Sequence, residues 1–170
     1  MPAADFTLRP ARTSDVPGIK RLVAPLAEER ILMAKETVAY YEGIQELRVA
    51  ESSEGELIGC GALHVMWEDL AEIRTLAAAD SWRGRGVGHA LVKRLLEEAR
   101  ALGVSRVFCL TFEVGFFQRH GFEVMADQSA VDPAVYAELL RSHDEGVAEF
   151  LDLARVKPNT LGNTRMIRRL

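Results

Sequence analysis

The chain has 170 residues, a formal net charge of −4, and 48% hydrophobic and 27% charged residues. This length fits one domain with its own core, and the composition excludes an intrinsically disordered protein. The acidic balance argues against a nucleic-acid or anionic-membrane binder. No apolar run approaches the ~20 residues of a membrane span, and the start lacks the pattern of a secretory signal. We expect one cytoplasmic domain over residues 1–170.

The first half of the chain alternates strand and helix patterns. A strand over residues 6–9 is followed by cap residues at 13–15 and a helix to about residue 27. A second helix is predicted over residues 35–46. Three further strands are predicted over 47–51, 57–65 and 73–78, the pattern of an antiparallel meander.

The second half opens with a change of period. Apolar residues recur at helical spacing from Val87 to Leu102, and Gly103 is a natural helix stop. We then predict a strand (106–111), a short helix (115–120), a strand (122–125), a helix opened by Asp132-Pro133, and a tail (163–170) that closes the sheet. Asp144-Glu145 is interpreted as a solvated turn. A strand–helix–strand unit over 73–111 requires one parallel pair, so the fold class is α+β with a mixed, mostly antiparallel sheet flanked by helices.

A glycine-rich loop between a strand and the long helix is the most informative stretch of the chain. It reads Trp82-Arg83-Gly84-Arg85-Gly86-Val87-Gly88-His89. Glycines let a backbone approach a ligand, and the unpaired N–H groups at a helix start favour an anion such as a diphosphate. A tight turn made only for packing would read the same way. There is no Gly-Lys-Ser/Thr of a Walker A loop, and the spacing is not that of a dinucleotide fingerprint.

The order of three motifs resembles the GNAT N-acetyltransferase superfamily. Arg83-x-x-Gly86-x-Gly88 resembles its acetyl-CoA loop, residues 8–15 its first strand and helix cap, and residues 116–122 its closing motif. A narrower similarity joins residues 59–64, 71–76, 108–111 and 147–166 to short, single-domain bacterial N-acetylglutamate synthases. The resemblance implies transfer of acetyl from acetyl-CoA to the α-amine of glutamate, or of glutamine, for arginine biosynthesis.

The same resemblance implies roles for individual residues. Glu72 is the candidate base that takes a proton from the substrate ammonium, directly or through water; the alternative is a surface glutamate at a strand edge. Backbone amides of Leu76, Ala77 and Ala78 are expected to hold the pantetheine arm and polarise the thioester carbonyl. The diphosphate is expected on the amides of the loop, where Arg83, Gly84, Arg85, Gly86, Val87, Gly88 and His89 form the cofactor-binding set.

One position departs from the family pattern. Phe117 stands where many members carry a tyrosine that protonates the leaving thiolate. The thiolate then leaves unassisted, or water or Thr111 supplies the proton, although a strand threonine is more often structural. We expect Phe117 to pack on the pantetheine or in the core.

An acidic amino-acid substrate needs cations, and arginine pairs with a carboxylate through two hydrogen bonds. Arg74 lies two residues after Glu72, so both side chains share one face of a strand. Arg165 lies on the final predicted strand, in a basic segment that could equally be a solvated tail. Arg30 and Lys35 lie near the helix that commonly covers the acceptor site in this family.

The remaining reactive residues predict no second chemistry. The histidines have no metal-ligand spacing, so we expect no metal, and Cys60 and Cys109 lie in apolar strands as packing residues. Two other functions stay open: a transferase for another small amine or a protein N-terminus, and a non-catalytic acetyl-CoA sensor, which Phe117 keeps under consideration. Small domains of this type often form homodimers, but the sequence identifies no interface.

Overall fold

The computed structural model describes residues 5–32, 34–125, 131–151 and 162–170. Its centre is a seven-stranded sheet in the order β1-β2-β3-β4-β5-β7-β6. The strands are β1 (Phe6–Pro10), β2 (Leu47–Ser52), β3 (Leu57–Trp67), β4 (Leu70–Ala78), β5 (Arg106–Thr111), β6 (Glu123–Val124) and β7 (Thr164–Arg169). Only β4 and β5 pair in parallel; the other neighbours are antiparallel. The predicted fold class is confirmed.

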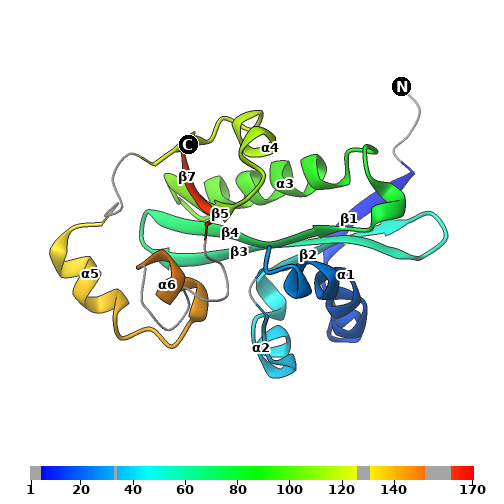
Figure 1. Cartoon of the computed structure of the whole chain (residues 1–170), viewed down its shortest axis with the longest axis horizontal. Coiled ribbons are helices and arrows are strands. Elements are labelled where there is room, and N and C mark those ends of the chain that lie inside the picture. Colours follow the sequence, from blue (N-terminus) through cyan, green and yellow to red (C-terminus); the bar gives the residue numbers. More distant parts are fainter. Residues whose placement is uncertain (1–4, 33, 126–130, 152–161) are drawn as a thin grey trace.

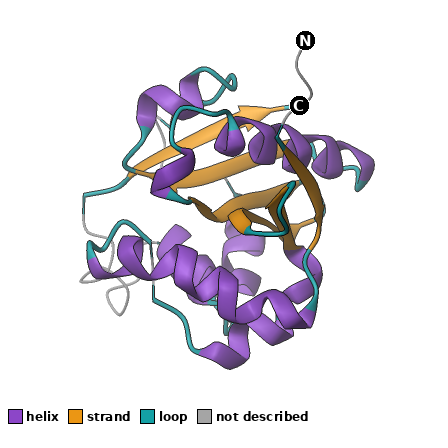
Figure 2. Ribbon diagram, turned by 90° about the vertical axis from the view of Figure 1, so that its right-hand side faces the viewer, coloured by secondary structure: helices purple, strands orange, loops and turns teal. Residues whose placement is uncertain are grey.

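Helices cover both faces of the sheet. They are α1 (Val16–Glu28), α2 (Thr37–Glu42), α3 (Val87–Ala101), α4 (Val114–Gln118), α5 (Pro133–Leu139) and α6 (Glu145–Phe150), with 3-10 turns at Thr13–Asp15, Ile44–Glu46 and Asp80–Trp82. Helices α3 and α4 lie on one face, and α1, α2 and α6 lie on the other (Figure 1). Seen after a quarter turn, the sheet is enclosed between two helical layers (Figure 2). None of the helices in these described ranges is long and apolar enough to cross a membrane.

The core is divided by the sheet into two halves. On one face, Leu91 and Leu95 of α3 are fully buried against the strands. On the other, Ile19 of α1 packs over β2 and β3, and Phe150 of α6 packs on Phe108 of β5 with ring centroids 4.4 Å apart. Helix α6 has only six residues, too few to be stable alone, so its packing on β5 holds it in place.

Three elements differ clearly from the sequence prediction. The helix predicted over residues 35–46 is observed as α2 (Thr37–Glu42) followed by a 3-10 turn at Ile44–Glu46. Strand β4 begins at Leu70, not at residue 73, because Leu70–Glu72 pair with Arg106–Phe108. The interpretation of Asp144-Glu145 as a solvated turn is wrong. Asp144 is the N-cap of α6, and its carboxylate accepts from the Val147 amide at 3.0 Å. A six-residue helix that contains a glycine carries too little periodicity to be predicted from the sequence.

Candidate active site

The parallel pair β4–β5 opens part-way along its length. Its register runs through Leu70–Glu72 opposite Arg106–Phe108, whereas β4 continues to Ala78 and β5 to Thr111. The main chain of β4 beyond Glu72 therefore leaves β5. Where two strands separate, their backbone N–H and C=O groups no longer pair with the neighbouring strand and can form hydrogen bonds with a ligand.

A bulge bends β4 within this open stretch. Cys60 pairs with Ala77 and Ala62 pairs with Arg74, so two residues of β4, Thr75 and Leu76, oppose one residue of β3. Thr75 has φ of +57°, a strained conformation for a β-branched residue. The Cys60 thiol donates to the Thr75 carbonyl at 3.4 Å. The bulge re-aims the main chain of Leu76–Ala78, the segment predicted to contact the pantetheine.

Glu72 lines a pocket on the α1/α6 face of the sheet. Its side chain is only 6% exposed, although it is polar, and Oε2 accepts from Arg74 Nε at 3.0 Å. The pocket is also lined by Lys35, Thr75 and Glu149. Lys35 Nζ donates to the Thr75 hydroxyl at 3.3 Å. The structure thus brings the predicted base, Arg74 and Lys35 to one pocket.

Arg74 is already occupied by two carboxylates. Besides Glu72, its Nη1 and Nη2 donate to the two oxygens of Asp144 at 2.8 Å each. Burial alone would lower the pKa of Arg74, but the Glu72 and Asp144 carboxylates raise it above its ordinary value. Partial burial alone would raise the pKa of Asp144, yet the hydrogen bonds and charge of Arg74 hold it well below its ordinary range. In this structure the guanidinium binds internal carboxylates.

The other predicted substrate cations lie in three different settings. Arg165 on β7 donates to the carbonyls of Phe150 and Glu149, at the C-terminal end of α6. Lys35 is half-buried; burial, then the charge of Arg74, lowers its pKa. Arg30 is exposed at φ of +58°, just after α1, and is not among the residues that line the pocket.

The predicted cofactor loop ends at the start of α3. Gly84 and Gly86 have φ of +77° and +82°, and no described atom lies within 4 Å of a Cβ added at either. This open space above a left-handed backbone suits a ligand that approaches the amides. Arg83 is exposed, and Arg85 stacks over Trp82, 4.3 Å from the ring centroid.

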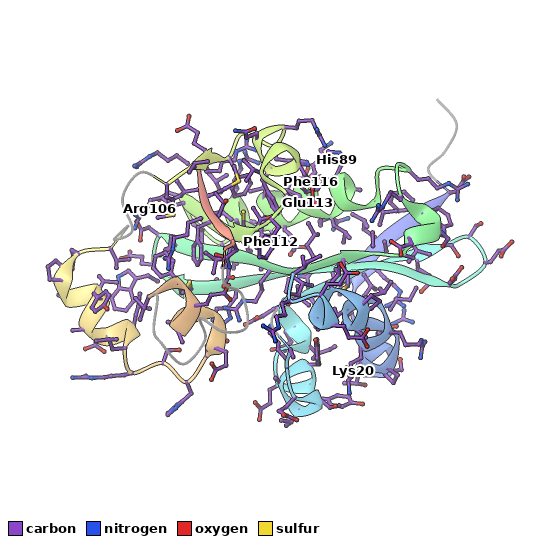
Figure 3. The ribbon with its side chains drawn as sticks, viewed as in Figure 1. Lys20, His89, Arg106, Phe112, Glu113 and Phe116 are labelled. Atoms are coloured by element: carbon purple, nitrogen blue, oxygen red, sulfur yellow. The ribbon has the colours of Figure 1, made fainter. Side chains whose placement is uncertain are left out.

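Gly88 and His89 are held by aromatic contacts with α4. A Cβ on Gly88 would meet Phe116 Cζ at 3.3 Å, so the lack of a side chain there serves packing rather than ligand approach. His89 stacks on Phe116 at 4.7 Å, and its Nδ1 lies 2.7 Å from Nε2 of His120. Figure 3 shows His89 and Phe116 together on the α3/α4 side of the sheet, far from Lys20 of α1.

Comparison with known proteins decides the family. Residues 25–122 match the acetyltransferase (GNAT) family. The chain belongs to the GNAT acetyltransferase family. The predicted superfamily, its acetyltransferase activity and its co-substrate, acetyl-CoA, are thereby confirmed.

Individual GNAT relatives cover most of the chain. An amino-acid acetyltransferase of Mycobacterium tuberculosis is 54% identical over 162 residues, 94% of this chain and 92% of the relative. A Mycobacterium tuberculosis structure solved with CoA has a TM-score of 0.92 at 54% identity, covering 96% of this chain and 99% of that chain. The N-acetylglutamate synthase of Neisseria gonorrhoeae, solved with coenzyme A and N-acetyl-glutamate, gives 0.79 at 26% identity, covering 97% of this chain but 35% of that one.

The two positions considered for thiolate protonation are buried. Phe117, the departure from the GNAT tyrosine, is 5% exposed and packs edge-on against Phe122 within the α3-side core. Thr111 ends β5, and its hydroxyl accepts from the Glu113 amide at 2.8 Å. The hydroxyl thus helps to turn the chain out of β5, and its proton remains available to an acceptor.

The cysteines have the surroundings of packing residues. Both are buried, and burial raises the pKa of the Cys60 thiol to about 12 and raises that of Cys109 further. A thiol that keeps its proton is a poor nucleophile. Over the described ranges, no three His, Cys, Asp or Glu side chains gather as metal ligands.

Proposed function

We propose that this protein acetylates the α-amine of L-glutamate or L-glutamine in the cytoplasm, as the first step of arginine biosynthesis. One observation carries the proposal: similarity to an amino-acid acetyltransferase extends over 94% of the chain. The pocket adds support, since its buried carboxylate lies where β4 leaves β5.

The proposed chemistry assigns the proton to Glu72. Acetyl-CoA supplies an activated thioester, which an amine attacks only after losing its ammonium proton. Glu72 accepts that proton, directly or through water, and such a base contributes typically ~10²–10⁴-fold in rate. Main-chain N–H groups of Leu76–Ala78 polarise the carbonyl, and the loop at Gly84–His89 holds the diphosphate. A carbon–nitrogen bond forms, the carbon–sulfur bond breaks, and the thiolate takes a proton from water or from Thr111.

The acceptor carboxylate is assigned first to Lys35. It is a half-buried cation that lines the pocket beside Glu72, whereas Arg74 and Arg165 bind groups of the protein itself. Arg30 lies on the same segment, between α1 and α2, and is a second cation for an acceptor that extends outward. Glu149 lines the same pocket, so both the dicarboxylate and its neutral amide need testing as acceptors.

The test is thiol release from acetyl-CoA with L-glutamate, L-glutamine, aspartate, lysine and spermidine offered separately. We expect turnover with glutamate or glutamine, and mass spectrometry should find acetyl on the α-nitrogen. A control without acceptor corrects for signal from protein thiols. Turnover confined to another amine would discard the arginine-pathway assignment, and acetyl-CoA binding without turnover on any amine would favour a sensor.

A further inference from the structure

We propose that Asp144 and Arg74 are a positioning pair that fixes the Glu72 carboxylate and, with it, helix α6 at the wall of the acceptor pocket. The inference rests on the role of Glu72 in the proposed function. It gives Arg74 a different task from the substrate clamp suggested by its position in the sequence. Asp144 belongs to none of the sequence motifs described above.

The guanidinium of Arg74 is saturated by two partners. Its Nε and Nη2 face Glu72 Oε2 at 3.0 and 2.8 Å, while Nη1 and Nη2 form a bidentate pair with Asp144. The Arg74 side chain is 8% exposed. A bidentate contact fixes direction as well as distance, so Asp144 sets the plane of the guanidinium, and that plane sets the position of Oε2.

The same contact fixes α6. Asp144 caps the helix through the Val147 amide, and Gly146 packs directly on the guanidinium, where an added Cβ would lie 2.6 Å from Nη2 of Arg74. Gly146 and Glu149 of α6 line the pocket together with Glu72. Base and pocket wall therefore share one anchor.

Further ionisable groups surround this anchor. Lys35 approaches from the segment after α1, Glu149 from α6, and Cys109 from β5. His64 of β3 lies beyond Asp144, with Nε2 3.9 Å from Oδ2, and its Nδ1 lies 2.7 Å from Glu46 Oε1. From Glu72, these close polar contacts run through Arg74, Asp144 and His64 to Glu46.

These contacts have a consequence for the base. The bidentate contact with Asp144 holds the guanidinium of Arg74 in one orientation, and the guanidinium in turn holds Oε2 of Glu72. Removing the Asp144 charge should loosen the guanidinium and therefore impair the orientation of Glu72.

The test compares Asp144→Asn and Arg74→Lys with wild type, and uses Glu98→Gln as matched control. Glu98 forms a partly exposed ion pair with Arg48 at 2.7 Å, away from the pocket. For Asp144→Asn we expect kcat to fall about 10- to 100-fold, the cost of a misplaced reacting group. Acetyl-CoA affinity should stay within about twofold of wild type, because the variant leaves the loop intact. Arg74→Lys keeps the charge but loses the bidentate fork and should lower kcat similarly.

The outcomes separate this inference from the proposed function. If the wild type shows no turnover with glutamate or glutamine, the proposed function is wrong. If the wild type is active and kcat is unchanged in Asp144→Asn, the positioning pair is overturned. A raised acceptor KM at unchanged kcat in Arg74→Lys also overturns it, since that result marks a substrate clamp.

A second measurement needs no turnover. Amide hydrogen exchange over residues 145–150 should accelerate in Asp144→Asn and Arg74→Lys and stay as in wild type in Glu98→Gln. Unchanged exchange in both pocket variants would refute the anchoring of α6, whether or not an acceptor has been identified.

Discussion

The predicted cofactor loop and the proposed acceptor pocket are built by different means. The loop works through its main chain: Gly84 and Gly86 hold left-handed conformations, and its side chains are largely exposed. The pocket depends on contacts between buried and partly buried side chains from distant parts of the sequence, such as Arg74 and Asp144, 70 positions apart. A site formed by the backbone of one short segment can be recognised from a sequence motif. A site formed by side-chain contacts between distant residues has no such motif.

The largest effect on turnover should come from a substitution in the proposed acceptor pocket. Glu72→Gln keeps the shape of the side chain but removes the proton acceptor, so turnover should fall about 10²- to 10⁴-fold. Acetyl-CoA affinity should change little, since the loop is untouched. Steady-state kinetics and a binding titration measure the two quantities separately. Near-wild-type turnover would remove Glu72 from the mechanism.

Gly86→Ala makes the opposite test on the loop. An alanine at φ of +82° costs about 1–2 kcal/mol, so the loop should leave its conformation and acetyl-CoA should bind about 5- to 30-fold more weakly. Turnover should recover at saturating acetyl-CoA. Gly103→Ala is the matched control, because Gly103 has φ of +86° at the far end of α3 and no described atom within 4 Å of an added Cβ. Equal weakening by both variants would mean that general destabilisation, not the loop, was measured.

Gly146→Ala sharpens the role of the pocket wall. Alanine normally favours a helix over glycine, but here its Cβ would overlap Arg74, so we expect a loss of about 1–3 kcal/mol in the free energy of unfolding. Denaturant unfolding measures it. Gly115→Ala in α4, where a Cβ meets no described atom within 4 Å, should instead gain up to ~1 kcal/mol. A gain at both positions would contradict the close packing of Arg74.

The smallest effect is in the pH dependence of stability. The pKa of Asp144 is lowered from 3.8 on folding by Arg74, so its ionised form stabilises the fold above about pH 4, and this contribution is lost as the pH falls through the folded-state pKa. Asp144→Asn should therefore cost about 1 kcal/mol at neutral pH. The difference from wild type should shrink below about pH 4. Urea unfolding at several pH values measures it, and a constant difference would contradict the ion pair.

These differences also explain what the sequence could predict. The long helix was predicted over residues 87–102 and observed as Val87–Ala101, because its apolar period and its terminal glycines are local signals. The strand–helix–strand unit followed from the same reasoning. The shared face of Glu72 and Arg74 followed from strand geometry and is seen in their hydrogen bond.

The features that the sequence did not predict depend on contacts between residues that lie far apart in the chain. The N-terminal end of β4 is extended by pairing with β5, and the bulge at Thr75 places a β-branched residue at positive φ, against its own preference. Asp144 was interpreted as part of a turn because its partner, Arg74, lies on β4, far away in the sequence. Arg165 was considered as a substrate cation because its charge was visible, whereas the α6 carbonyls that it binds were not.

The place of β7 in the sheet sets an order of assembly. This strand follows the other described strands in sequence, yet it lies between β5 and β6 and carries the arginine that holds the C-terminal end of α6. During synthesis, the glycine loop leaves the ribosome some eighty residues before β7, and the long helix follows the loop directly. The nascent chain can therefore form the half that carries the glycine loop first, and the wall of the proposed acceptor pocket is completed only after β7 has emerged.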